Sequence, residues 1–175
     1  MHLTGCGNGN RAQTLAIGAL GSPDRPHVFF DRDVRKGRAL ASALRILMIY
    51  GTGCDITEIA RIEHALERFG DHFMQKILSP REREELHGRP AEYLAGRFAA
   101  KEAAVKALGT GFRAGIQMAH VEILNNELGA PVLTFLAQAL DYAKTHGITR
   151  NFLSLSHERH YAVAFVVLET DLTRV

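Results

Sequence analysis

Cysteine and long apolar runs are both scarce in this sequence of 175 residues. No apolar stretch approaches the roughly 20 residues that a membrane-spanning helix needs, so we expect no membrane-spanning segment. Cys6 and Cys54 are the only two cysteines. They are too few for a disulfide scaffold and lack the spacing of a zinc site. We therefore expect a protein of the reducing cytoplasm.

Net charge is also small, at +2, but it is unevenly distributed. Residues 1–47 carry seven Lys and Arg against three Asp, a surplus of four positive charges. The remaining 14 basic and 16 acidic residues leave residues 48–175 at −2. Because the basic excess lies in the leading segment, it is weak support for nucleic-acid binding by the folded part. We expect no nucleic-acid partner.

The chain divides near Met48 into a leader and one patterned domain. Its length is enough for a single domain with a sizeable core, and 46% hydrophobic with 23% charged residues is typical of soluble globular proteins. The leader offers only a strand at His27–Phe30 and a short helix at Ala39–Leu47, without a clear apolar partner face. We interpret residues 1–47 as a disordered N-terminal extension, or as translation begun upstream of the true start. The domain is then 48–175.

The first strand and helix of the domain have clear boundary signals. Met48–Cys54 reads as a strand, and Asp55 with Glu58 has the spacing of a capping box. The helix is predicted to stop at Gly70. Its apolar stripe consists of Ile59, Ile62, Leu66 and Phe69. Cys54 is expected to be a small buried hydrophobic side chain.

Two further helices follow. Ser79–Glu82 is a second capping-box sequence, with proline at the first helical position, and Gly88 ends that short helix. Pro90 opens an alanine-rich helix that runs through Ala107 and stops at Gly109. Small side chains along it allow close packing against neighbouring elements.

The second half of the domain is mostly strand. Val121–Leu124 and Val132–Phe135 form a predicted hairpin, Ala137–His146 a helix, and Phe152–Ser156 and Tyr161–Leu168 two further strands. Helices early and antiparallel strands late indicate an α+β fold, with a mostly antiparallel sheet packed with helices.

The most informative stretch for chemistry lies on the alanine-rich helix. Glu102 and Lys106 are one turn apart on one face, and Arg97 and Lys101 are likewise paired. Periodicity alone fits a solvated salt-bridge face better than a catalytic site. We expect Lys101 to be a structural or peripheral charge.

Two other features favour a site. Asp55 follows the glycine-rich Gly51–Cys54, where a backbone can approach a ligand closely, and Ser154–His157 ends a strand. Carboxylate oxygens suit Mg²⁺, which is commonly held by one or two carboxylates together with substrate phosphates. Lys and Arg nearby suit the remaining phosphate charge.

Taken together, these motifs resemble the holo-acyl-carrier-protein synthase family, the small bacterial type of 4′-phosphopantetheinyl transferase. The resemblance runs from Met48 to about Glu169. Met48–Ile56 resembles its opening G-x-D motif, and Phe98–Lys106 matches F-x-x-K-E-A-x-x-K. Gly129–Pro131 resembles its G-x-P hairpin. Ser154–His157 resembles its S-x-[ST]-H strand end.

The resemblance implies transfer of 4′-phosphopantetheine from coenzyme A to a serine of apo-acyl carrier protein, in fatty acid biosynthesis. It implies that Asp55 and Glu102 coordinate Mg²⁺ and that Lys106 neutralises the attacked or leaving phosphate. Arg97 and His157 would help to hold the coenzyme A nucleotide and its phosphates. Glu102, directly or through water, is one candidate for the base that takes the serine proton.

The resemblance also implies partners. Arg61 would meet the acidic carrier protein, and Arg68 shares its exposed face seven residues on. Alternatively, both arginines only keep the helix soluble. The family resemblance further implies a homotrimer with active sites at subunit boundaries.

Two other functions stay open. A metal-dependent phosphohydrolase acting on a nucleotide-like substrate would use the same carboxylates, with water in place of the serine. A non-catalytic module whose basic leader binds nucleic acid would keep that binding without Asp55 and Glu102.

Overall fold

The structure is a computed structural model that describes residues 16–18 and 47–171. An antiparallel four-stranded sheet has the order β1-β5-β6-β2. Its strands are β1 (Ala16–Gly18), β2 (Leu47–Glu58), β5 (Ile148–His157) and β6 (Tyr161–Asp171). The second sheet is a hairpin of β3 (Val121–Asn125) and β4 (Pro131–Phe135). The expected α+β fold with antiparallel pairing is confirmed.

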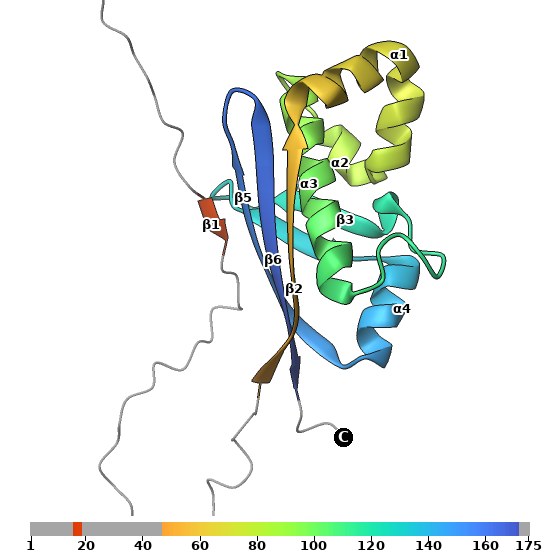
Figure 1. Cartoon of the computed structure of the whole chain (residues 1–175), viewed down its shortest axis with the longest axis vertical. Coiled ribbons are helices and arrows are strands. Elements are labelled where there is room, and N and C mark those ends of the chain that lie inside the picture. The colour runs from red at the N-terminus through yellow and green to blue at the C-terminus, as the bar shows by residue number, and fades with distance from the viewer. Residues whose placement is uncertain (1–15, 19–46, 172–175) are drawn as a thin grey trace, which may run out of the picture.

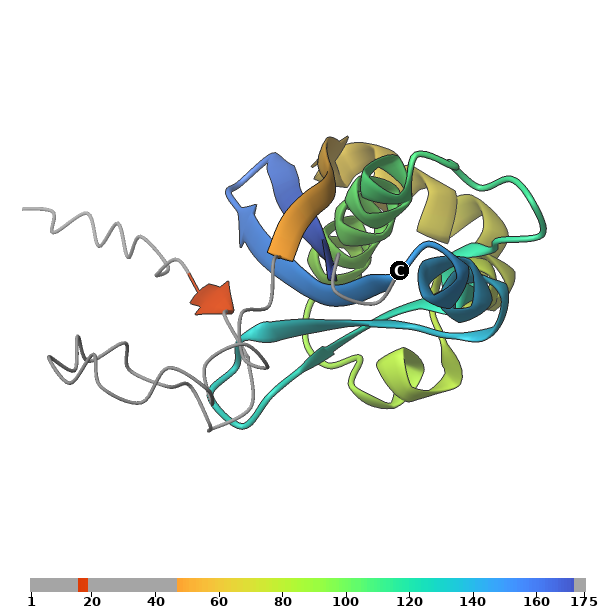
Figure 2. The same ribbon diagram turned by 90° about the horizontal axis from the view of Figure 1, so that it is seen from below.

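Helix α3 (Pro90–Leu108) lies along one face of the four-stranded sheet (Figure 1). Figure 2, a view from below in which α3 is seen nearly end-on, shows the β3–β4 hairpin crossing beside the helix. The remaining helices are α1 (Ile59–Ile77), α2 (Pro80–Glu84), the 3₁₀ turn η1 (Met118–His120) and α4 (Ala137–Thr145). None of the described helices is both long and apolar enough to cross a membrane.

The buried side chains form two clusters on either side of α3. Its alanines pack against β6 and the hairpin in the larger cluster, whereas Leu94 and Ala95 pack against α1 in the smaller. Seven alanines on α3 therefore do what the sequence indicated, since their small side chains bring the helix close to its neighbours.

The expected boundaries of α2 and α3 are confirmed. Ser79 and Glu82 form the predicted capping box, with the Ser79 amide 2.6 Å from Glu82 Oε2. Helix α3 begins at Pro90 and ends before Gly109, whose φ of 77° lies in the left-handed region that glycine adopts without strain.

The predicted capping box at Asp55 is wrong. Strand β2 continues to Glu58, paired with Tyr161 of β6, and α1 begins only at Ile59. Glu58 is the N-cap residue and makes no side-chain cap hydrogen bond. Pairing with β6 supplies the backbone partners that a cap would have supplied, so Asp55 is a strand residue.

The predicted stop at Gly70 is half right. Gly70 has φ 53° and ψ −136°, which breaks the helical path, but helix resumes and runs to Ile77. Of the predicted apolar stripe, Ile59 and Ile62 are buried and Leu66 packs against them in part, whereas Phe69 is 51% exposed.

Residues 1–47 are described only at β1 and at Leu47, the first residue of β2. β1 pairs antiparallel with Leu153–Leu155 of β5. The predicted strand His27–Phe30 lies outside the described residues. So does the predicted helix Ala39–Leu47, apart from Leu47 itself.

Cys54 is exposed, contrary to expectation. It lies on the face of β2 that points away from α3, opposite Phe165 of β6. Other apolar side chains on the same two strands are exposed as well, including Ile56 at 64%, Val163 at 37% and Phe165 at 46%. One face of the sheet is thus covered by α3, and the other presents an apolar surface.

Candidate active site

Two glycines bring β2 unusually close to α3. A Cβ at Gly53 would lie 2.0 Å from the carbonyl oxygen of Ala103, and one at Gly51 would lie 2.2 Å from that of Ala107. Real side chains do not occupy such positions, so only glycine allows this approach. The glycine-rich sequence before Asp55 therefore sets the distance between the strand and the helix that carries Glu102.

Asp55 is held at this contact by two hydrogen bonds. Lys106 Nζ lies 2.7 Å from Asp55 Oδ1 and 3.1 Å from the Cys54 carbonyl oxygen. The Thr57 hydroxyl donates to Asp55 Oδ2 at 3.0 Å, and Thr57 is buried. Burial of Thr57 fixes the orientation of the Asp55 carboxylate, whereas Lys106 reaches it from a half-exposed position.

Glu102 lies one turn before Lys106 on α3 and close to Asp55. Burial raises the pKa of Glu102, and the neighbouring Asp55 carboxylate raises it further. Lys106 and Arg61 act in the opposite direction. The hydrogen bond to Asp55 raises the pKa of Lys106. Two carboxylates thus share a site with two cations, as expected for a place that binds both a metal and phosphate.

The donor set fits a magnesium ion. Among residues 16–18 and 47–171, no group of three or more His, Cys, Asp and Glu side chains is arranged to hold a metal. Two hard carboxylates without a full protein cage are what Mg²⁺ uses when substrate phosphates and water complete its coordination. Asp55 and Glu102 fit that description.

Arg97 and His157 line a different pocket, of about 480 Å³. Arg89 and Tyr93 line it too. Its volume falls within the range of roughly 300–1,000 Å³ that is usual for small-molecule sites. Two of the residues expected to contact the nucleotide therefore meet in one pocket.

Arg97 is buried, with 4% of its surface exposed, but not all of its guanidinium nitrogens donate a hydrogen bond. Its guanidinium lies 4.2 Å from the centroid of the Tyr93 ring, and one terminal nitrogen donates to Asn125 at 3.2 Å. Glu85 is 3.7 Å away. Within the described part of the chain, its Nε has no hydrogen-bond partner. An unsatisfied buried donor in a pocket favours an anionic ligand.

Helix α3 separates this pocket from Asp55. Asp55 pairs with Ala164 of β6, which pairs with Leu155 of β5, so β2 and β5 lie about 10 Å apart. Glu102 follows Arg97 by five residues, a rotation of about 140° around the helix axis. The Asp55 cluster and the Arg97 pocket therefore lie on different sides of α3.

The two expected docking arginines are both exposed on α1. Arg61 lies over the Phe98 ring, 5.5 Å from its centroid, and close enough to Glu102 to affect its pKa. Arg68 lies over Phe69 instead, at 5.1 Å. Only Arg61 thus belongs to the Asp55 cluster.

Sequence reasoning missed Thr57, Arg89 and Tyr93. Tyr93 could have been found, because it precedes Arg97 by four residues and so shares its face of the helix. Thr57 could not, since its role depends on Asp55 being in a strand, where residues two apart share a face. Lys101, expected to be structural, is completely buried.

Comparisons with known proteins agree with this arrangement. Residues 51–166 match the family model of the 4′-phosphopantetheinyl transferase superfamily. The holo-[acyl-carrier-protein] synthase of Maridesulfovibrio salexigens is 50% identical over 123 residues, covering 70% of this chain and 99% of that protein. The crystal structure of the Neisseria meningitidis synthase has a TM-score of 0.65 and 42% identity, over 69% of this chain and 98% of that one. The Bacillus anthracis synthase, solved in complex with coenzyme A (3′,5′-ADP), has a TM-score of 0.58 and 41% identity, over 70% and 98%.

Proposed function

This chain belongs to the holo-[acyl-carrier-protein] synthase family of the 4′-phosphopantetheinyl transferase superfamily, and we propose that Asp55, Glu102 and Lys106 carry out its reaction. The reaction transfers the 4′-phosphopantetheine group of coenzyme A to a serine of apo-acyl carrier protein, as fatty acid biosynthesis requires. Membership of this family supports a transferase over a phosphohydrolase and over a non-catalytic module. The observation that carries the residue assignment is the 2.7 Å contact between Lys106 and Asp55 beside Glu102.

Asp55 and Glu102 would hold Mg²⁺, which supplies charge stabilisation to the pyrophosphate of coenzyme A when bound. Lys106 is half-exposed and next to both carboxylates, so its ammonium is placed to neutralise a phosphate oxygen as the leaving group departs. Thr57 keeps the Asp55 carboxylate in one orientation through its hydrogen bond.

The serine oxygen forms a bond to the β-phosphorus, and the bond from that phosphorus to the bridging oxygen breaks, releasing 3′,5′-ADP. The serine proton needs an acceptor. Glu102 lies beside Asp55 at the place where the reaction would occur, so it is one candidate for this acceptor, directly or through a water molecule.

The pocket around Arg97 and His157 would receive the nucleotide part of coenzyme A. Tyr93 offers an aromatic face, Arg97 a free buried donor and Arg89 an exposed cation. Because α3 stands between this pocket and Asp55 in one protomer, a complete site needs the pocket of one copy beside the carboxylates of another. This supports the trimer with sites at subunit boundaries.

The exposed apolar face of β2 and β6 supplies a surface for that assembly. Ile56, Val163 and Phe165 form a patch on the side of the sheet that α3 leaves bare. Contiguous apolar patches of this kind mark interaction sites. The basic face with Arg61 and Arg68 would then remain for the acidic carrier protein, and the domain 48–175 contains the whole proposed site.

Metal titration of alanine variants tests the assignment. Asp55→Ala and Glu102→Ala should bind Mn²⁺, used as a spectroscopic substitute for Mg²⁺, far more weakly than the wild type and should lose transfer while keeping their thermal stability. Lys106→Ala should bind the ion and lose about 10²-fold in kcat. Wild-type metal affinity in both carboxylate variants would rule out the proposed metal site.

A further inference from the structure

A buried polar network lies directly behind the proposed active site. Lys101 precedes Glu102 on α3, and its side chain is completely buried. Its ammonium donates to Glu82 Oε2 at 2.6 Å and to the carbonyl oxygens of Val121 and Met118 at 2.6 and 3.1 Å. A lysine ammonium has three N–H donors, and all three are used.

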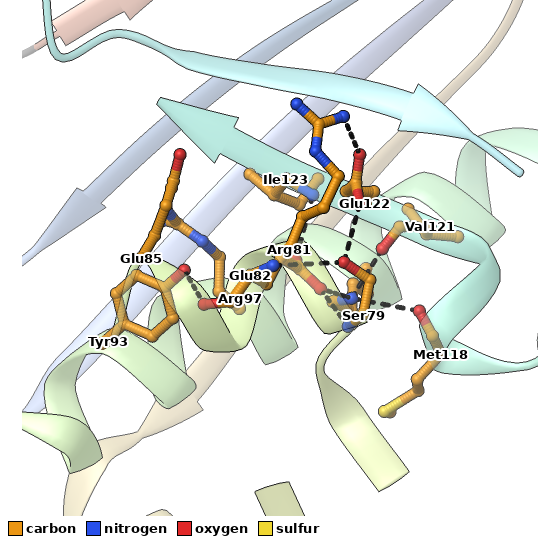
Figure 3. Close-up of polar contacts among 11 residues, drawn as sticks. Ser79, Arg81, Glu82, Glu85, Tyr93, Arg97, Met118, Val121, Glu122 and Ile123 are labelled. Atoms are coloured by element: carbon orange, nitrogen blue, oxygen red, sulfur yellow. Dashed lines mark hydrogen bonds and ion pairs between the residues drawn. The ribbon is translucent and has the colours of Figure 1, made fainter. Parts of the chain in front are cut away.

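Glu82 connects this lysine to two other elements, and Figure 3 shows Glu82 beside Ser79 and Ile123. Its Oε2 accepts from the Ser79 amide at 2.6 Å, and its Oε1 accepts from the Ile123 amide at 2.9 Å. The Ser79 hydroxyl donates to Glu122 at 2.7 Å, and Arg81 pairs with the same carboxylate at 3.2 Å. The network thus ties α3 to the start of α2 and to β3.

The direction of Lys101 fixes the direction of Glu102. Consecutive residues on a helix are about 100° apart around its axis. Because Lys101 points to α2 and β3, Glu102 points to Asp55 and Arg61. Burial lowers the pKa of Lys101, and the carboxylate of Glu82 opposes that shift. The ammonium of Lys101 and the carboxylate of Glu82 are both fully hydrogen-bonded, as buried ions require.

We propose that Lys101 is a positioning residue: held by Glu82, it fixes the rotation of α3 and so directs Glu102 and Lys106 toward Asp55. This rests on the proposed function, which places the reaction at those three residues. The first lysine of the K-E-A-x-x-K motif is then an internal anchor, and the second acts on phosphate.

A direct phosphate contact by Lys101 is the competing role. It would require the ammonium to leave three acceptors and a side-chain environment without exposure to solvent. Glu82 would then be left buried with no cation, which is costly. The structure favours the anchor.

A double-mutant cycle tests the proposal in the full-length chain. The variants are Lys101→Met, Glu82→Gln and their combination, with Lys144→Met on the exposed side of α4 as the matched control. Thermal stability is measured first, and steady-state kinetics are measured below the unfolding transition of each variant.

Each single change should lower kcat about 10-fold or more through misplacement of Glu102, with the Michaelis constant for coenzyme A within about 2-fold of the wild type. The combined variant should lose no more kcat than the weaker single variant, because the two residues act as one unit.

Three results would overturn it. One is wild-type kcat in folded Lys101→Met. Another is a loss in the double variant equal to the product of the single losses. The third is a raised Michaelis constant for coenzyme A caused by Lys101→Met alone.

The double variant leaves no buried unpaired charge, so it should fold even where a single variant does not. Ser79→Ala removes only a flanking hydroxyl and should give a smaller loss of kcat in the same direction. Glu102→Gln, measured in parallel, distinguishes failure of the proposed active site from failure of the positioning role of Lys101. Unchanged activity in Glu102→Gln refutes the proposed site, whereas its loss together with wild-type kcat in Lys101→Met refutes only the positioning role.

Discussion

Gly53→Ala should increase the distance between β2 and α3 at the active site without altering a functional side chain. The added methyl would lie 2.0 Å from the Ala103 carbonyl oxygen and 2.7 Å from the Ala107 amide nitrogen. Carbon and oxygen atoms approach to roughly 3.3 Å, so the gap between β2 and α3 must open by about 1.3 Å. Both neighbours are helix backbone and cannot rotate away.

This displacement would move Asp55, which lies two residues further along β2, away from α3. Its 2.7 Å contact with Lys106 would lengthen to about 4 Å, beyond hydrogen-bonding distance. Overpacking of this kind costs about 1–3 kcal/mol of stability or more. A displacement of about 1 Å in a catalytic arrangement costs on the order of 10²-fold in rate.

Urea unfolding and steady-state transfer to apo-acyl carrier protein measure the two effects separately. Gly96→Ala is the matched stability control, because its methyl would meet only the Leu155 side chain at 3.4 Å. In the interior of α3 that exchange should be neutral or stabilising by up to about 1 kcal/mol. Wild-type stability and kcat in Gly53→Ala would refute the idea that glycine sets the distance between β2 and α3.

Three other predictions concern partners and boundaries. Arg68→Glu should raise the Michaelis constant for the carrier protein, most strongly at low salt, and should leave the Michaelis constant for coenzyme A unchanged. Arg61→Glu should raise the Michaelis constant for the carrier protein further and should also lower kcat, since Arg61 lies near Glu102. Equal effects on both substrates would place the docking face elsewhere. Sedimentation should show a trimer, and Ile56→Glu on the exposed sheet face should shift it to inactive monomers, whereas an active monomer would contradict the shared site. A chain starting at Met48 should fold and stay active, because Tyr50 is the first residue that packs against the core of the described chain; aggregation or loss of activity would show that the leader contributes.

The sequence predicted those elements whose signals are local. Ser79 with Glu82, and Pro90 with Gly109, mark helix ends through backbone hydrogen bonding and allowed φ, which depend on adjacent residues only. The Asp55 capping box failed because pairing with β6 is a long-range contact, and it outweighs a local pattern that fits a helix start equally well.

The candidate site likewise divides into residues that the sequence revealed and residues whose role depends on long-range contacts. Motif spacing singled out Asp55, Glu102 and Lys106, and the fold brings them together. Periodicity could not reveal that Arg97 and Lys101 are buried, because an isolated helix pattern of charges is typical of a solvated face. Only the positions of α2 and β3 show that these cations face inward, and the capping-box motif marks Glu82 only as a residue of a helix start.

Mass spectrometry of an apo-acyl carrier protein shows whether this chain transfers 4′-phosphopantetheine and whether the transfer needs Glu102. After incubation with coenzyme A, Mg²⁺ and the wild-type chain, the carrier protein should gain one 4′-phosphopantetheine group on a serine, with release of 3′,5′-ADP. Glu102→Gln, at equal concentration and equally folded, should leave the carrier protein unmodified over the same time. An unmodified carrier protein with the wild type, or full modification with Glu102→Gln, would contradict the account.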